Sequence, residues 1–479
     1  MKTSLHFSLA LASLVFMACG SEIVNSTNTD ALDGETSSQT GNKESCVPGV
    51  GGPGSVAISL DGELRTVESG EGMAMNTMEE DGAPWRFWYV SPIAASTCGD
   101  AGLVYTSGEF GHLYYVRLSP TAEEPVLVDD EWNWESRTVA LVYDSNCEPM
   151  VVTVTPDDGL VYFIQVEDGP WQSVSTGAGA AQGGNVALSA VKNTPSGEIT
   201  AFIERTNGEQ KEVVALKYDP ATAMSWTPRT VALPDVGMVF DYAMGSDGLV
   251  RMVHQAKLEF PCDPCDLDLL CSVEDGNGNW LSSVIQDSRW GDPDDRFSEP
   301  ASLVLTPDNT PIVAACYQER VITGSLKKSE LRVYSRDSDG DWCYETVVDQ
   351  QDGFAGGDGS HFTGQEPMIR LGPAGEPVVL FHDLSEWHDS NGANGIVGQP
   401  RLAVRSQDRW SMLTLHAQPG QQDSPNPLHG FRNGRFAVTP TGLVFGGVEF
   451  IWETDSIYNN TEVPIHFKLF SGSATVAWP

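Results

Sequence analysis

One pattern of turns and tryptophans recurs along this 479-residue chain. Eight times, an apolar stretch ends at a tight polar turn, a second apolar stretch follows, and a tryptophan comes 23 to 36 residues after the turn. The turns lie near Gly62, Gly102, Glu148, Gly197, Gly248, Thr310, Gly375 and Gly442, and the tryptophans are Trp85, Trp132, Trp171, Trp226, Trp280, Trp342, Trp410 and Trp478. Successive turns lie roughly 40 to 67 residues apart, a spacing typical of repeats in which each unit is a small β-sheet.

The clearest unit predicts four short strands in succession. Its first three apolar segments are Thr138–Tyr143, Met150–Val154 and Leu160–Val166, and a last turn precedes Trp171. The third segment is apolar without alternation, which requires cover on both faces of the sheet. Neighbouring sheets stacked around a ring would supply that cover. The sequence has no convincing ten-residue amphipathic helix pattern.

The predicted fold class is therefore all-β: a β-propeller of four-stranded blades over residues 55–479, an architecture that leaves only short, protected sheet edges. The units begin near Ser55, Ile93, Thr138, Asn185, Met238, Ala301, Pro367 and Arg435, which favours eight blades. Segment Met73–Met78 is a poor strand, so seven blades plus an N-terminal extension is the alternative. The tryptophans, one per repeat, are interpreted as wedges between blades.

One turn carries a sequence motif. Segment Ser335–Trp342 reads Ser-Arg-Asp-Ser-Asp-Gly-Asp-Trp and keeps the serine, aspartate and tryptophan of an Asp box, with the glycine displaced by one position. With the turn, Val-rich strand and tryptophan of the other units, it resembles the repeats of secreted bacterial propellers of the sialidase-like, BNR or Asp-box superfamily. The resemblance implies a propeller over nearly the whole exported chain. It does not imply sialidase activity, because the sequence lacks the Phe/Tyr-Arg-Ile-Pro motif and a convincing arginine triad.

Acidic residues dominate the charge of the chain. It contains 66 Asp and Glu against 27 Lys and Arg, which gives a formal net charge of −39. Coulomb repulsion makes nucleic acid and anionic membrane surfaces poor partners for such a protein. We interpret the excess of acidic residues as a solvated surface, because net charge relates more directly to solubility than to a particular function. Divalent cations or a basic ligand are the alternative.

The N-terminal segment indicates export. Residues 1–18 resemble a signal peptide, in which Lys2 precedes an apolar run too short to span a bilayer. The run leads to Cys19 in a sequence similar to the lipobox of bacterial lipoproteins, where the cysteine is lipidated. Residues 19–54 are then the lipid anchor and a disordered tether of small, polar and acidic residues. An outer-membrane or cell-surface lipoprotein is expected, and cleavage after Gly20 with soluble secretion is the alternative.

The nine cysteines suit an oxidising compartment. Eight remain once Cys19 is lipidated or removed. Cys98 and Cys147 fall in the first turns of neighbouring units, and Cys316 and Cys343 fall on strands of one unit. These two pairs are the candidate disulfides.

Loop length places the candidate binding face. In a four-stranded blade, the connection from second to third strand and the connection to the next blade open on the same face, and both lengthen in the last four units. Loops on a rigid scaffold commonly carry binding groups. The candidate residues on this face are Arg289, Trp290, Arg296, Arg320, His361, His382, Asp383, Trp387 and His388. Such side chains suit carbohydrate recognition or acid–base chemistry. Variable surface loops without a ligand are the alternative.

One metal site is a candidate. Asp337, Asp339 and Asp341 alternate around Gly340, a spacing that can present oxygen ligands to a structural Ca²⁺. These residues belong to a turn on the opposite face from the long loops. No other cofactor is predicted.

The leading functional hypothesis is a ligand-binding module on the cell surface, with a polysaccharide or a protein as partner and the membrane contacted only through the lipid anchor. The molecule is expected to be a monomer. A carbohydrate-active enzyme, either a hydrolase or a lyase, with its site on the loops of the last four blades is the alternative. A purely structural surface protein is the third hypothesis, because a propeller by itself does not specify a function.

Overall fold

The computed structural model describes residues 43–44, 56–62, 64–74, 92–107, 112–118, 123–130, 138–155, 157–165, 169–180, 186–207, 210–220, 225–257, 265–266, 268–290, 294–321, 326–349, 361–388, 394–406, 409–415, 428–452 and 463–478. All the regular structure in these residues is β-strand. The predicted signal peptide, Cys19 and most of the predicted tether lie outside them. No helix in the described residues is long and apolar enough to cross a membrane.

Seven sheets of at least four strands form in the described part of the chain, and we number them as blades along the sequence. Blade one contains β4 (Ile93–Ala95), β5 (Ala101–Ser107), β6 (His112–Arg117) and β7 (Val126–Asp129). Blade two contains β8 (Val139–Tyr143), β9 (Pro149–Thr155), β10 (Gly159–Gln165) and β11 (Trp171–Ser175). Blade three contains β12 (Val186–Asn193), β13 (Ile199–Asn207), β14 (Gln210–Asp219) and β15 (Ser225–Ala232).

The next three blades repeat this antiparallel order and carry additions. Blade four contains β16 (Val239–Met244), β17 (Val250–Gln255), β19 (Leu269–Glu274) and β20 (Trp280–Gln286), with a separate ribbon of β18 (Cys265–Asp266) and β21 (Arg289–Trp290). Blade five contains β22 (Asp294–Leu305), β23 (Pro311–Val321), β24 (Leu326–Arg336) and β25 (Trp342–Asp349). Blade six contains β26 (His361–Leu371), β27 (Pro377–His388), β28 (Asn394–Ser406) and β29 (Arg409–Thr414).

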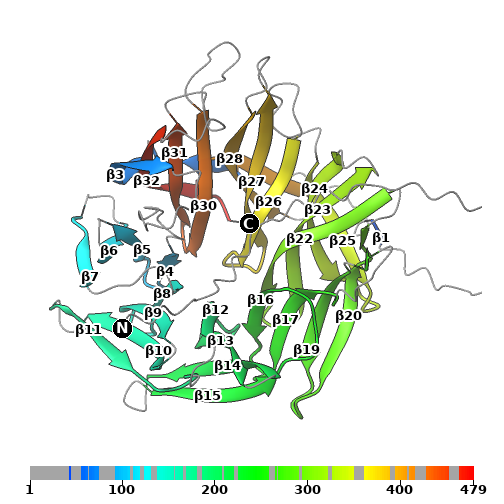
Figure 1. Ribbon diagram of the computed structural model, residues 1–479, viewed down its shortest axis with the longest axis horizontal. Helices are drawn as coiled ribbons and strands as arrows, with labels where there is room; N and C mark the ends of the chain where they lie inside the picture. The colour runs from blue at the N-terminus through cyan, green and yellow to red at the C-terminus, as the bar shows by residue number, and fades with distance from the viewer. Residues whose placement is uncertain are drawn as a thin grey trace, which may run out of the picture. The chain divides into compact units, whose positions relative to one another are not determined.

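Both ends of the described chain build the seventh blade. It contains β30 (Leu428–Thr439), β31 (Gly442–Trp452) and β32 (Val463–Val476), and its outer strand is the pair β2 (Ile58–Leu60) and β3 (Arg65–Ala74). In Figure 1, blue β3 accordingly lies beside red β32. The break between β2 and β3 falls at Gly62, whose φ of 96° favours glycine.

The ring closes through the first strand of each blade. Contacts run from β4 to β8, β12, β16, β22, β26 and β30, and from β30 back to β4 (Figure 1). These seven first strands therefore surround a central channel. We call the side carrying the turns between first and second strands the turn face, and the opposite side the loop face.

Seven hydrophobic clusters hold the blades together, one at each interface between neighbours. The cluster between blades two and three, for example, includes Met150, Tyr162, Leu216 and Trp226, which are all almost fully buried. Burying one such large side chain stabilises the fold by about 1.5–3 kcal/mol. Both faces of each blade meet a neighbour, which explains why the strands are apolar without alternation.

The tryptophans confirm the predicted wedge role where the structure describes them. Each of three tryptophans lies at the start of a fourth strand and belongs to the cluster shared with the preceding blade: Trp171, Trp226 and Trp342. Three others pack against such clusters: Trp280, Trp410 and Trp478. Three indole nitrogens also donate across the interface. Trp280 donates to Ala232 O, Trp342 to Ser283 Oγ and Trp410 to Glu345 Oε2. Trp85 and Trp132 lie outside the described residues.

The favoured count of eight blades is wrong, and the seven-bladed alternative is confirmed. The first unit, near Ser55, and the last, near Arg435, are two parts of one blade. The turn near Gly62 interrupts an outer strand and joins no hairpin, because β2 and β3 both pair with β32. Hydrogen bonding between the chain ends leaves no local signal in the sequence. The pattern of each part therefore resembles that of a separate unit.

Two further expectations need correction. Within the predicted tether, β1 (Lys43–Glu44) pairs in parallel with β25 at the outer edge of blade five. Cys316 and Cys343 do not pair with each other: Cys316 keeps its thiol, whose Sγ lies 3.4 Å from Thr363 O, whereas Cys343 is in a disulfide. They lie on β23 and β25 with β24 between them, which prevents a direct bridge. The other candidate pair, Cys98 and Cys147, does form a disulfide.

Candidate functional site

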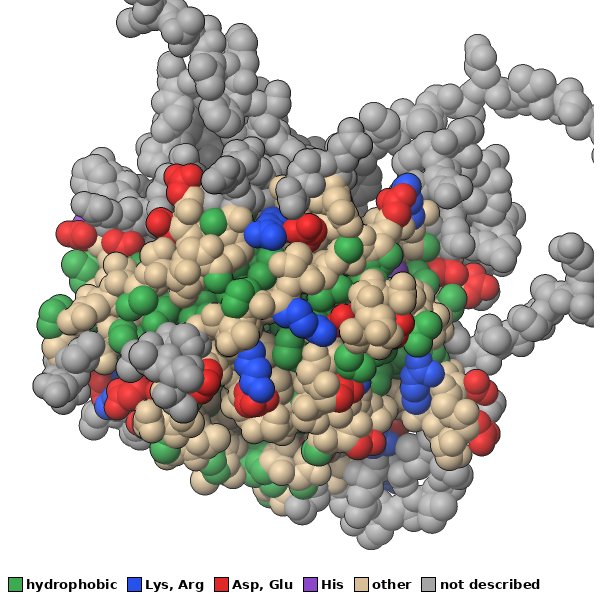
Figure 2. Space-filling model, turned by 90° about the horizontal axis from the view of Figure 1, so that it is seen from below, with side chains coloured by type: hydrophobic (Ala, Val, Ile, Leu, Met, Phe, Trp, Pro, Cys, Tyr) green, Lys and Arg blue, Asp and Glu red, His purple; other side chains and the backbone are tan. Residues whose placement is uncertain are grey.

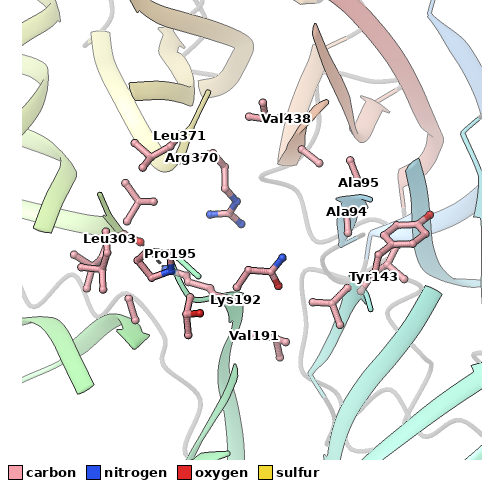
Figure 3. Close-up of a pocket in the computed structure, with 18 of the residues that line it drawn as sticks. Ala94, Ala95, Tyr143, Val191, Lys192, Pro195, Leu303, Arg370, Leu371 and Val438 are labelled. Atoms are coloured by element: carbon pink, nitrogen blue, oxygen red, sulfur yellow. Dashed lines mark hydrogen bonds between the residues drawn. The ribbon is translucent and has the colours of Figure 1, made fainter. Parts of the chain in front are cut away.

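The central channel widens into a cavity at the turn face. Its volume is about 360 Å³, within the range of small-molecule sites. All seven first strands line it with their last residues, among them Ala95, Tyr143, Leu305, Leu371 and Val438. Lys192 and Arg370 bring positive charge into this otherwise largely apolar lining, and Figure 3 shows them entering the cavity from β12 and β26.

Asp241 neutralises Lys192 at the cavity wall. The Lys192 ammonium donates to Asp241 Oδ2 at 2.5 Å and to Leu303 O at 2.7 Å. The same carboxylate accepts from Ser302 Oγ at 3.2 Å and from the amides of Leu303 and Tyr242 at 2.8 and 2.9 Å. Asp241 is therefore held by four donors from blades three, four and five, and its capacity as an acceptor is largely used.

Glu366 and Arg435 lie nearer the loop face, on two of the strands that surround the channel. Glu366 lies on β26, four residues before Arg370, and Arg435 lies on β30. Burial lowers the pKa of Arg435, the Glu366 carboxylate opposes this shift, and the charge of Arg370 adds to it. The three side chains are therefore close enough to interact electrostatically within one channel.

The buried imidazole of His382 lies beside the partly exposed carboxylate of Glu366. The Nδ1 atom of His382 lies 3.7 Å from Glu366 Oε2, and the imidazole is buried while the carboxylate is 39% exposed. Glu366 has a φ of 48°, in the left-handed region that is costly for a residue other than glycine. Strain of this kind persists only where surrounding contacts enforce it, and it concentrates at binding and catalytic sites.

A second carboxylate beside His382 is buried and paired. Asp383 Oδ1 accepts from Thr363 Oγ1 at 2.5 Å, and Asp383 Oδ2 accepts from Arg401 Nη1 at 2.7 Å. The side chain of Asp383 is 3% exposed and that of Arg401 is 14% exposed. The ion pair joins β27 to β28, and the hydrogen bond from Thr363 joins β26 to β27, so Asp383 links the first three strands of blade six.

The structure places the predicted site residues in three backbone groups. Arg289 and Trp290 lie on the ribbon of blade four, Arg296 and Arg320 on β22 and β23 of blade five, and His361, His382, Asp383, Trp387 and His388 on β26 and β27 of blade six. Within the last two groups, β22 and β26 start, and β23 and β27 end, at the loop face. His382 and Asp383 are the two whose side chains lie in the described part of the chain, and they belong to the cluster above.

The three predicted calcium ligands, Asp337, Asp339 and Asp341, lie in one turn. Asp337 Oδ1 accepts from the backbone amides of Asp339 and Asp341, both at 3.0 Å, so this carboxylate closes its own turn. Among the described residues, no group of three or more His, Cys, Asp and Glu is arranged to hold a metal ion. The same turn occurs at Asp275, whose Oδ1 accepts from the amides of Asn277 and Asn279.

Sequence analysis did not single out several polar and charged residues described above. Thr363, Glu366 and Arg401 were not singled out, nor were Lys192, Asp241 and Arg370. A usable signal was present, because each channel charge interrupts the apolar first strand of its blade, as Lys192 does in Val186–Asn193. The loop-based search could not find these residues, since they lie within strands.

Acidic side chains are spread over the surface visible in Figure 2, and Lys and Arg side chains lie among them. This distribution agrees with the interpretation of the negative charge as a solvated surface. The positive charges of the channel therefore contrast with the acidic balance of the whole chain, which is −39.

Together, these residues offer a ligand three kinds of interaction. Glu366 can accept hydrogen bonds from hydroxyl groups, and Lys192, Arg370 and Arg435 supply positive charge. The imidazole of His382 can donate or accept a hydrogen bond. The first strands of a closed ring hold all of these groups, which limits their movement.

The fold and this channel define the class of the protein as a seven-bladed β-propeller with a charged central channel. No protein-family model matches the chain, and no curated protein matches it. Its similarity to known proteins is therefore found among solved structures.

Three solved structures illustrate that similarity. Polysaccharide lyase Uly1 is 10% identical with a TM-score of 0.46, over 82% of this chain and 94% of that one. AofleA from Arthrobotrys oligospora is 9% identical with a TM-score of 0.39, over 73% and 91%. The Bacteroides ovatus xyloglucan PUL GH43B protein is 11% identical with a TM-score of 0.30, over 82% and 98%. Similarities at this level transfer neither an activity nor a site residue to this chain.

Proposed function

We propose that this protein is an exported binding module that takes a polysaccharide at the loop-face end of its central channel. The observation that carries the proposal is Glu366: its partly exposed carboxylate is held in a strained backbone conformation beside buried His382. A carboxylate fixed in this way accepts hydrogen bonds from sugar hydroxyl groups without a further entropic cost of ordering. The paired Asp383 and Arg401 support the strand that carries His382.

Replacement of Glu366 by Gln tests this site. The test uses the full exported chain on immobilised glycans, and both retention and product release are scored. Hydrogen bonds to a charged group contribute about 1.5–3 kcal/mol, so E366Q is expected to weaken retention by about tenfold or more. E148Q is the matched control, because Glu148 is exposed in a turn on the turn face. Equal retention by wild type and E366Q would remove Glu366 from the proposed site.

A second candidate function is hydrolysis or lysis of the same polysaccharide. The contact between His382 and Glu366 favours it, because an imidazole beside a carboxylate can transfer protons. Product release by the wild type and its loss in H382Q would establish an enzyme. H254Q is the control, since His254 is equally buried but lies in blade four. Retention without products supports the binding module.

We also propose that the protein reaches the cell surface as a lipoprotein of the Asp-box propeller type. The lipobox-like sequence around Cys19 and the polar segment after it support anchoring. The turns at Asp337 and Asp275 support the Asp-box type, because each aspartate accepts from two amides of its own turn and is followed five residues later by tryptophan. Labelling with a radioactive fatty acid is expected for the wild type and not for C19S. Equal labelling of both chains would exclude Cys19 as the acceptor.

A further inference from the structure

Lys192 and Arg370 occupy equivalent positions in their blades. Each lies two residues before the first residue of the turn that follows its first strand, Thr194 and Gly372 respectively. The equivalent residues of the other blades that line the cavity are Ala94, Val142, Ala243 and Val304. This level of the channel therefore carries two cations among small apolar residues, with no carboxylate in these six positions.

The two cations face one another across the ring. Lys192 belongs to blade three and Arg370 to blade six, which are on opposite sides of a seven-membered ring. Figure 3 shows the Arg370 guanidinium reaching into the cavity, whereas the Lys192 ammonium lies at the wall beside Leu303. Cavity space separates the two side chains. Among the described residues, the equivalent positions of the neighbouring blades carry no carboxylate.

Arg370 lacks a compensating anion within the described part of the chain. Its Nη1 donates to Ile369 O at 2.9 Å, and it forms no ion pair there. The Asp241 carboxylate acts electrostatically on Arg370, but it already accepts from Lys192 and three other donors. The guanidinium therefore has further N–H donors that can serve a ligand in the cavity.

One carboxylate, Asp241, acts on both cations, so the positive charge of the pair is only partly compensated. Burial lowers the pKa of Lys192, Asp241 opposes this shift, and the charge of Arg370 adds to it. Burial also lowers the pKa of Arg370, with Asp241 opposing. A negative group bound between the two would offset the cost of burying their charges and would weaken their mutual repulsion.

We propose that the turn-face cavity is a binding site for a small carboxylate, held between Arg370 and Lys192. A guanidinium matches the two oxygens of a carboxylate with parallel hydrogen bonds, and the ammonium adds a point charge. Asn193 at the rim supplies a neutral donor, and the aliphatic walls accommodate the body of the ligand. This site lies at the end of the channel away from the proposed polysaccharide site, and it does not depend on that proposal.

Glucuronate and glucose are a matched pair of probes, since they differ in one carboxylate. Each is added to the full exported chain at constant ionic strength, and heat release and the midpoint of thermal unfolding are measured. Glucuronate is expected to bind with a Kd below about 1 mM and to raise the midpoint, whereas glucose is expected to do neither at this site. Binding should weaken as salt rises, because the contact is between charges.

Replacement of Arg370 by Gln removes one of the two charges. R370Q is expected to bind glucuronate at least tenfold more weakly than the wild type, which is the loss of one charged hydrogen-bonded contact. R409Q is the matched control, because Arg409 is exposed on β29 and its replacement changes the net charge equally.

A second variant keeps the test decisive if R370Q fails to fold. Ala94 lines the same level of the cavity, so A94D places a carboxylate of the chain itself near the two cations. A94D is expected to lose glucuronate binding while remaining folded. Absence of glucuronate binding by the wild type overturns the proposal, as does unchanged binding in R370Q or, where that variant does not fold, in A94D.

Discussion

Single buried side chains in this propeller are accommodated by specific hydrogen bonds, and His254 is the clearest case. Its Nδ1 lies 2.8 Å from Gln255 O and its Nε2 lies 2.7 Å from Ser272 Oγ. A carbonyl oxygen only accepts, so Nδ1 carries a proton, while the serine hydroxyl can donate to Nε2 when the ring is neutral. Burial lowers the pKa of His254 below its usual value of 6.5, which favours the neutral ring.

This neutral histidine makes part of the stability depend on pH. The unfolded chain binds a proton near pH 6.5 and the folded chain binds it only at lower pH. Stability is therefore full above pH 6.5 and decreases as pH falls from 6.5 towards the folded pKa, by up to about 1.4 kcal/mol per pH unit for one proton. In urea unfolding, H254Q is expected to lose less free energy of unfolding between pH 7.5 and 5.5 than the wild type. The same decrease in both chains would contradict a buried neutral His254.

At the scale of elements, the turns between first and second strands share one geometry. In blades one to six the first residue of the turn pairs with the residue four positions later, and the fourth residue has a positive φ. Glycine takes that fourth position at Gly99, Gly197, Gly248 and Gly375, whereas Cys147 and Asn309 take it in blades two and five. The geometry of the turn explains why glycine marks most of the repeats.

The disulfide between Cys98 and Cys147 joins two of these turns, so it ties blade one to blade two across 49 residues. A cross-link over a loop of this length commonly stabilises a protein by about 2–4 kcal/mol through the unfolded state. The free energy of unfolding of the double variant C98S/C147S is expected to be lower by that amount. The variant should therefore unfold at a lower denaturant concentration. Wild type in the presence of a reductant is the companion measurement. An unchanged midpoint in both would show that the bridge adds no stability.

At the scale of the whole molecule, stability depends on the joining of the two chain ends. Ile58 pairs with Val476 and Ala74 with Val463, so the outer strand of blade seven comes from the start of the described chain. Asp61 strengthens the junction, because its Oδ1 accepts from Thr475 Oγ1 at 2.7 Å and from the Thr475 amide at 3.1 Å. Without β2 and β3, the edge of β32 has no partner on that side, and such an edge can pair with other chains.

Removal of residues 1–74 tests this closure. The truncated chain is expected to lose its cooperative unfolding transition or to aggregate, because blade seven loses its outer strand and the edge of β32 is left without a partner on that side. Removal of residues 1–41 is the control, since it leaves β1, β2 and β3 in place. A cooperative transition at an unchanged midpoint after removal of residues 1–74 would show that blade seven is stable with three strands.

Local patterns in the sequence were enough to predict the all-β class, the four-stranded unit and the wedge role of tryptophans such as Trp171 and Trp226. Each of these depends on neighbouring residues: the turn chemistry, the apolar runs and the tryptophan after the last turn. Tertiary structure decided the blade count, because β2 and β3 pair with β32 only when the ring closes. It also decided the site, since Lys192 and Arg370 are 178 residues apart in sequence and share a cavity only through the symmetry of the ring.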